Sequence, residues 1–106
     1  MNPVTVTLSN VAGGTRSTVI APDWRMNPFA VSVYVVASGT VNYTVQDTPD
    51  DFPNVVPSNW FSHPTLVTLT ASANGNYAFP TRGISIVVNS GTGSVTMTII
   101  QGAGIF

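Results

Sequence analysis

The side chains best suited to chemistry lie close together in the middle of the chain. His63 is the single histidine, and Asp47, Asp50, Asp51 and Asn54 fall within eight residues. Oxygen-bearing side chains in such a cluster suit a hard cation such as Ca²⁺. Aspartates beside prolines, however, more commonly form turns and accept backbone N–H groups. No EF-hand loop or Gly–Asp repeat accompanies the cluster, so we expect turn-forming aspartates and no bound metal.

The sequence offers little to a catalytic mechanism. No nucleophile elbow frames a serine for a Ser–His–Asp triad, and a lone His63 has no partner group that would define its role. Asp50 and Asp51 are adjacent, so on an extended segment they point to opposite sides and cannot act as a glycosidase pair. The Gly91–Gly93 turn joins two predicted strands and opens no helix, so it is not a phosphate loop. We predict a protein that is not an enzyme, holds no cofactor, and packs His63 within a loop.

The composition is poor in ions and rich in hydroxyl groups. Only 7% of the 106 residues are charged, whereas about 25% is usual for a soluble domain. The chain has no lysine, glutamate or cysteine, and its polarity comes from 14 Thr, 10 Ser and 9 Asn. Three scattered arginines make nucleic acid an unexpected partner, and no apolar run approaches the ~20 residues of a membrane span. Because interface cores are depleted in charge, we favour a subunit covered in an assembly over a secreted β-domain with a hydroxyl-rich face.

Alternation of apolar and polar residues predicts a single all-β domain over residues 1–106. Short strands at this spacing are typical of an antiparallel β-sandwich, and we expect a jelly roll with seven or eight strands. The predicted strands cover residues 4–8, 17–21, 29–37, 40–48, 65–70, 77–79, 83–89 and 94–101.

Two predicted β-hairpins share one design. Residues 31–35 lead through Ser38–Thr40 into 41–46, and residues 84–88 lead through Ser90–Thr92 into 95–99. Glycine provides the positive φ that tight turns require. The apolar rows of these strands form the predicted core: Val31, Val33, Val35, Val41, Tyr43, Val45, Ile84, Ile86, Val88, Val95, Met97 and Ile99. Val36, Val87 and Ile100 fall on the opposite faces, which must be covered by loops or by another chain.

Residues 49–64, called the Pro loop below, differ from the rest of the chain. They contain four prolines and three aromatic residues. A loop of this length within a compact domain is usually functional or disordered, and aromatic anchors argue for order. Because aromatic residues dominate interface energetics, we predict interface anchors in this loop, in the 22–28 segment and at the C-terminal tip: Trp24, Met26, Phe52, Trp60, Phe61, Ile105 and Phe106.

Several segments resemble small structural proteins of tailed-bacteriophage virions. The resemblance rests on Val41–Gln46, Thr48, Asp50–Asp51, Trp60–His63 and Gly93–Gln101 within residues 30–101. It implies a capsid decoration (cement) protein with a jelly-roll fold, which would bind the major capsid protein on the outside of the shell and stabilise the shell. Copies would associate as dimers or trimers at a symmetry axis, and no catalytic residue is implied.

Other functions and locations stay open. A tail, fibre or head–tail connector subunit is the second expectation, and a carbohydrate-binding sandwich with Trp24 or Trp60 as the sugar platform is the third. The start, Met1–Thr5, has no basic flank or apolar h-region, so we expect synthesis in a host cytoplasm without Sec export. The expected final location is the virion surface.

Overall fold

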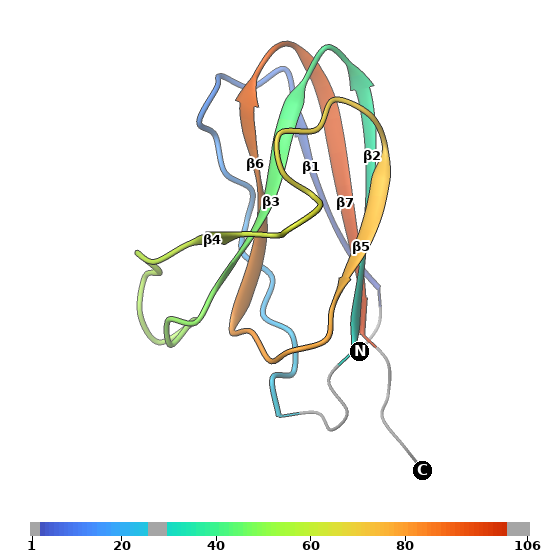
Figure 1. The fold of residues 1–106 in the computed structure, drawn as a ribbon. Helices are drawn as coiled ribbons and strands as arrows, with labels where there is room; N and C mark the ends of the chain where they lie inside the picture. Colours follow the sequence, from blue (N-terminus) through green and yellow to red (C-terminus); the bar gives the residue numbers. More distant parts are fainter. Residues whose placement is uncertain (1–2, 26–29, 102–106) are drawn as a thin grey trace.

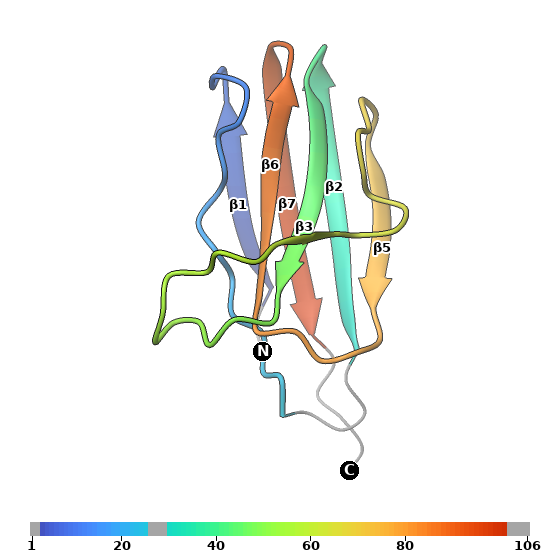
Figure 2. The same ribbon diagram turned by 60° about the vertical axis from the view of Figure 1, so that its left-hand side comes forward.

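The chain folds into two antiparallel β-sheets packed face to face. A computed structural model describes residues 3–25 and 30–101. Sheet A has four strands in the order β1-β7-β2-β5, and sheet B has three in the order β4-β3-β6 (Figures 1 and 2). The predicted all-β sandwich is therefore confirmed. No helix in the described residues is long and apolar enough to cross a membrane.

The strands follow the alternation of the sequence. Their bounds are β1 Val4–Ser9, β2 Val31–Gly39, β3 Asn42–Thr48, β4 Phe61–Ser62, β5 Ala73–Tyr77, β6 Gly83–Ser90 and β7 Gly93–Gln101. β-Branched residues dominate the longer strands because they pack well on a pleated surface. β5, with the sequence ANGNY, lacks such residues, and the prediction placed its strand at 77–79 instead.

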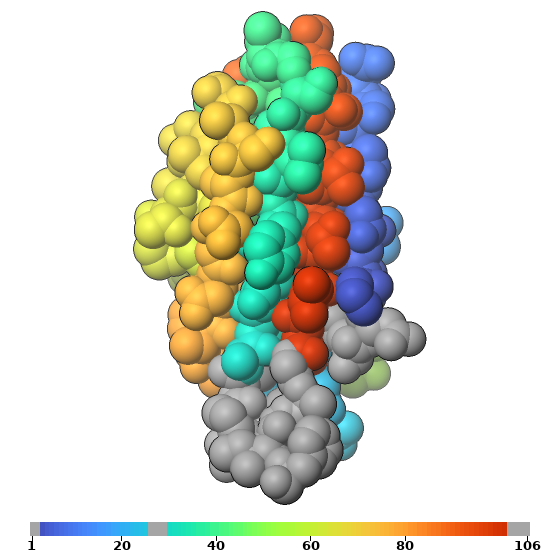
Figure 3. Space-filling model, turned by 90° about the vertical axis from the view of Figure 1, so that its right-hand side faces the viewer, coloured from blue at the N-terminus to red at the C-terminus, as the bar shows by residue number. Residues whose placement is uncertain are grey.

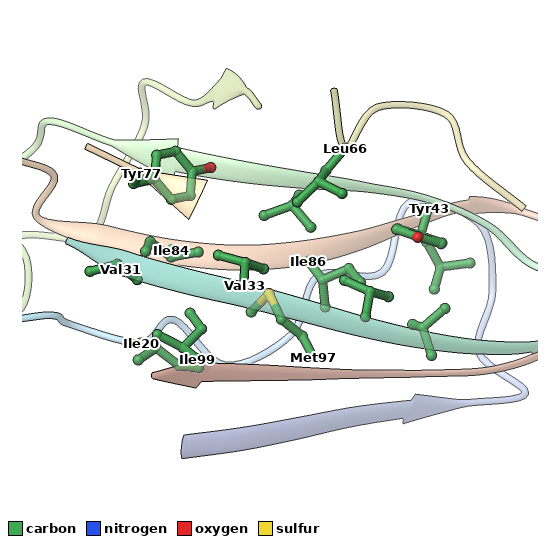
Figure 4. Packing of buried hydrophobic residues seen from close by; sticks show 14 of the residues in the cluster. Ile20, Val31, Val33, Tyr43, Leu66, Tyr77, Ile84, Ile86, Met97 and Ile99 are labelled. Atoms are coloured by element: carbon green, nitrogen blue, oxygen red, sulfur yellow. The ribbon is translucent and has the colours of Figure 1, made fainter. Parts of the chain in front are cut away.

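The core lies between the two sheets and matches the predicted apolar rows. Each of the twelve predicted core residues is at most 2% exposed, because inward-facing positions recur at every second residue. The structure adds Ile20, Leu66 and Tyr77 to this cluster (Figure 4). Leu66 comes from a loop that covers one edge of the sandwich, which strand periodicity does not reveal.

The two predicted hairpins are wrong: both segments are arches that cross between the sheets. β2 lies in sheet A and β3 in sheet B, and β6 and β7 are divided in the same way. β2 pairs with β7, and β3 pairs with β6, so the arches lie side by side at one end of the sandwich (Figure 1). A hairpin and an arch have the same inward-facing row in each strand, so alternation does not distinguish them.

Glycine allows the two arches to pack closely. The backbone N–H of Thr40 donates to the carbonyl of Thr92 at 2.8 Å, and the Thr92 N–H donates to the Thr40 hydroxyl at 3.2 Å. Gly91 has φ +83°, and a Cβ added there would lie 2.8 Å from the carbonyl carbon of Thr40. Gly39 has φ +87°, and its added Cβ would lie 2.7 Å from the Thr92 carbonyl oxygen. Neither position accepts a side chain without backbone movement.

Two predicted strands are irregular segments that flank sheet B. Residues 16–20 approach β6 through isolated bridges at Arg16 and Ile20 and through hydrogen bonds between Ser17 and Ile86, without forming a continuous strand. Residues 65–70 approach β3 through one bridge between Tyr43 and Leu69. Thr68 has φ +48°, and this left-handed conformation interrupts an extended strand.

The jelly-roll topology stays a prediction. The order β1-β7-β2-β5 in one sheet, with the 16–20 segment beside β6 in the other, is compatible with it.

Candidate interaction surfaces

The two sheets differ in how their outer faces are covered. On sheet B, Arg16 donates to the Ser85 hydroxyl and to the Gln46 side-chain oxygen, both at 2.6 Å. The Thr68 N–H donates to the Thr44 hydroxyl at 3.0 Å. The segment between β1 and β2 and the segment between β4 and β5 thus cover parts of sheet B (Figure 2). Nothing within residues 3–25 and 30–101 covers the outer face of sheet A in the same way (Figure 3).

The outer face of sheet A is an open surface of hydroxyl, amide and apolar side chains. In Figure 3 the strands β5, β2, β7 and β1 lie side by side across it. Threonine pairs link neighbouring strands, with hydroxyl oxygens 3.0 Å apart for Thr5 and Thr98 and 3.1 Å apart for Thr7 and Thr96. The strand register places these residues on the face: Thr5, Thr7, Ser9, Ser32, Tyr34, Val36, Ser38, Asn74, Asn76, Ser94, Thr96, Thr98 and Ile100.

Charged side chains are completely separated from this face. The four strands of sheet A contain no Asp, Glu, Lys, Arg or His. All seven charged residues of the chain lie in sheet B or in loops: Arg16, Asp23, Arg25, Asp47, Asp50, Asp51 and Arg82. Val36, at 64% exposure, and Tyr34, at 45%, stand in the middle of the uncharged face. Such a face can be covered by a partner without the cost of removing water from ions.

The Pro loop is ordered by its aspartates, as expected for turn-forming residues. The Asp50 carboxylate accepts the backbone N–H groups of Ser58 at 2.7 Å and Asn59 at 2.9 Å, and the Asn59 side chain donates at 3.1 Å. The bond from the Asn59 side chain, followed by those from the backbone, holds the pKa of Asp50 below its usual value. The loop extends away from the sandwich (Figure 1), and Val56 within it is 91% exposed.

The structure brings two predicted anchors together around Arg82. Trp24 and Phe52 line a groove of about 360 Å³ with Arg82 between them. The Arg82 guanidinium lies 4.8 Å from the centre of the Trp24 ring and pairs with Asp51. Trp24 is thus an exposed aromatic with a cation beside its ring, an arrangement worth about 0.5–1 kcal/mol at exposed sites.

Trp60 is held against sheet B rather than presented freely. The guanidinium carbon of Arg16 lies 4.0 Å from the centre of the Trp60 ring. Burial lowers the pKa of Arg16 from its usual value. Because a guanidinium covers one ring face of Trp60, at most the opposite face remains for a sugar.

Phe61 lies in a second groove, about 400 Å³ in volume, whose floor carries Asp47. The groove is lined by Asp47, Pro49, Phe61, Ser62, Pro64, Phe79, Pro80 and Thr81. Phe61 is 59% exposed and Phe79 is 52% exposed. Asp47 is buried, and removal of its carboxyl from water raises the pKa of this group, an effect opposed by the hydrogen bond from Thr81.

His63 is a buried residue that fixes the Pro loop to the sandwich. One ring nitrogen, Nε2, lies 2.8 Å from the Asn76 carbonyl, which requires a proton on Nε2. The other, Nδ1, accepts the backbone N–H groups of Thr65 at 3.1 Å and Leu66 at 3.3 Å. The ring also packs edge-on against Tyr77 with centroids 4.9 Å apart. These contacts confirm the predicted loop-packing role.

Three of the predicted anchors, Met26, Ile105 and Phe106, lie outside the described residues. The exposed Val56 and Phe79 and the Asp47 groove were not predicted from the sequence. Val56 lies between Pro53 and Pro57 in the Pro loop. This segment has no alternation of apolar and polar residues from which the exposure of Val56 could be predicted. Asp47 continues the inward row of Tyr43 and Val45 and lies opposite Ile84, so alternation places it inward, but the groove around it depends on residues distant in sequence, such as Phe79.

The comparisons with known proteins concern the fold. No protein-family model matches the sequence, and neither does any curated protein. The structure is similar to one chain of a solved structure described as "Bacillus endospore appendages form a novel family of disulfide-linked pili", with 19% sequence identity and a TM-score of 0.50. The similarity covers 92% of this chain and 82% of that chain. The two chains share an all-β fold.

Proposed function

We propose that this chain is a structural subunit without catalytic activity, which docks onto neighbouring proteins through the outer face of sheet A. The observation that carries this proposal is the complete segregation of charge away from that face. Protein interfaces exclude charge from their cores but retain aromatic side chains. Tyr34, Val36 and Ile100 provide exposed apolar area among the hydroxyl groups.

The narrower proposal is a capsid decoration protein on the outside of a phage head. It is supported by the resemblance of residues 30–101 to tailed-phage virion proteins. In that role the face of sheet A would lie on the major capsid protein, and the Pro loop with its exposed Val56 would reach a neighbouring subunit or a sister copy. The expected location is then the virion surface.

A second candidate is a subunit of a homopolymeric filament. It is favoured by the fold shared with a chain from Bacillus pili over 92% of this chain. In addition, β1 is an edge strand with the sequence VTVTLS, which lacks the charges and prolines that usually prevent edge pairing. The chain has no cysteine, so contacts between its copies would be noncovalent.

A matched pair of lysine substitutions tests the docking face. Thr98→Lys places a charge at the centre of the sheet A face, whereas Thr70→Lys places the same charge on an exposed loop beside β3 of sheet B. Burying an unpaired ammonium in an interface is costly, so Thr98→Lys should weaken docking by more than about tenfold. Thr70→Lys should leave docking unchanged, and circular dichroism should show that both variants are folded.

The docking measurement also distinguishes the two candidates. A decoration protein should cosediment with expanded empty heads at a fixed copy number and raise their melting temperature. A filament subunit should instead increase in mass with concentration when centrifuged alone. If wild type binds neither heads nor itself, or if Thr70→Lys weakens binding as much as Thr98→Lys, the proposal is wrong.

A further inference from the structure

The groove above Asp47 combines a buried carboxylate with exposed aromatic walls. The Asp47 side chain forms its floor, and Phe61 and Phe79 line it while more than half exposed. Pro49, Pro64 and Pro80 complete an apolar rim. An apolar groove with a single charged group at its floor selects ligands that carry the opposite charge.

The carboxylate of Asp47 is stabilised by hydroxyl groups but has no cation partner within the described residues. The buried Tyr77 hydroxyl, like that of Thr81, favours its charged form. The Thr81 hydroxyl lies 3.2 Å from Asp47 Oδ2, but it also lies 3.2 Å from the Thr48 carbonyl and 3.4 Å from the Gly83 carbonyl. A hydroxyl has one proton and can satisfy only one of these acceptors well. Asp47 forms no ion pair in this part of the chain, where the ion pairs are Arg25–Asp23 and Arg82–Asp51.

The arginines nearest in sequence and space are engaged elsewhere. Arg16 contacts Ser85, Gln46 and the Trp60 ring. Arg82 lies against Asp51 and the Trp24 ring. A buried carboxylate without a cation is unfavourable because it loses hydration and gains no charge partner. The raised pKa of Asp47, caused by burial, agrees with this geometry.

From this geometry we infer that the Asp47 groove is a docking site for an arginine side chain presented by a partner protein. A guanidinium donates two parallel hydrogen bonds to a carboxylate, and its flat faces stack on aromatic rings. Asp47 supplies the acceptor, and Phe61 and Phe79 supply the rings. The apolar rim of prolines would contact the methylene groups of the arginine and its apolar sequence neighbours.

The site deepens the proposed docking function by adding a second contact with stated chemistry. It lies at sheet B and the Pro loop, away from the face of sheet A. The test of the groove uses the isolated chain and a small probe. The groove inference can therefore be wrong while the proposal of docking through sheet A is correct, and the docking proposal can be wrong while the groove inference is correct.

The probe is the blocked tripeptide acetyl-Leu-Arg-Leu-amide, compared with the same peptide carrying citrulline. Citrulline keeps the planar urea group but has no charge. NMR titration of the isotope-labelled chain should show the arginine peptide shifting the signals of Asp47, Phe61 and Phe79, with a millimolar dissociation constant. The citrulline peptide should bind at least about fivefold more weakly, a difference of about 1 kcal/mol.

Three variants locate the binding energy. Asp47→Asn keeps an acceptor for Thr81 and removes the charge, so it should fold normally and bind the arginine peptide at least about fivefold more weakly. Phe79→Ala, at an exposed position, should also weaken binding by removing one aromatic wall. Asp23→Asn removes the same charge from an exposed site outside the groove and serves as the matched control.

The inference is overturned if the arginine and citrulline peptides bind equally, if Asp23→Asn weakens binding as much as Asp47→Asn, or if the arginine peptide shifts no groove signal at tens of millimolar. A further variant, Arg25→Gln, tests whether the arginine comes from a second copy of this chain. If wild-type chains self-associate and both Asp47→Asn and Arg25→Gln abolish this association, the partner is a second copy.

Discussion

The contact between the two arches gives a quantitative prediction for Gly91→Ala. At this residue an alanine must adopt φ near +83°, and its Cβ would lie 2.8 Å from the Thr40 carbonyl carbon and 3.2 Å from Val41 Cα. Both of these atoms belong to the backbone of the opposite arch and cannot rotate away. Gly14 provides the matched control, because it has φ +89° with nothing within 4 Å of an added Cβ.

The expected magnitudes follow from these two environments. A left-handed backbone costs an alanine about 1–2 kcal/mol at either position. Overpacking adds about 1–3 kcal/mol at Gly91 only. Each kcal/mol lowers the melting temperature of a domain of about 100 residues by about 4 °C. We therefore expect Gly14→Ala to melt about 4–8 °C below wild type, and Gly91→Ala about 8–20 °C below.

The assay is calorimetry of wild type and both variants, with urea unfolding as a second measurement of the free energy. Alanine restricts the unfolded chain equally in both variants, so this contribution cancels in the comparison. If the two variants melt within about 2 °C of each other, the arches do not pack as described and β2–β3 and β6–β7 must be connected differently.

Three further predictions concern the loops. His63→Ala removes a ring that makes hydrogen bonds to Asn76, Thr65 and Leu66, so urea unfolding should show a loss of about 3 kcal/mol; a loss below about 1 kcal/mol would contradict the structural role. Arg16→Lys keeps the charge but loses the planar group over Trp60, so tryptophan emission should shift to longer wavelength, whereas Arg25→Lys, 6.0 Å from the Trp24 ring, should change it little. Asp50 has a pKa below its unfolded value, so its contribution is present above that unfolded value and is lost as the pH falls through the lower folded pKa. The Ser58 and Asn59 amide signals should therefore move in that acidic range in wild type, and the same acid transition in Asp50→Asn would refute the assignment.

The sequence by itself determined which side chains face the core. Val33, Ile86 and Met97 were placed correctly because an extended chain alternates its side chains between two faces whatever strand lies beside it. The ordered Pro loop was also predictable, since prolines limit the backbone and aspartates such as Asp50 capture nearby N–H groups. The composition indicated a surface with few charged side chains, but it did not indicate which part of the fold forms that surface.

The tertiary structure decided how the strands are combined. A short glycine-containing link can connect two strands either as a hairpin or as an arch. Only the packing of Gly39 and Gly91 against the opposite arch selects the arch. The groove around Asp47 and the continuous uncharged face of sheet A arise in the same way. Both depend on contacts between residues distant in sequence, such as Thr81 with Asp47 and Thr98 with Tyr34. Local patterns carry no information about such contacts, because they are set by the sheet to which each strand is added.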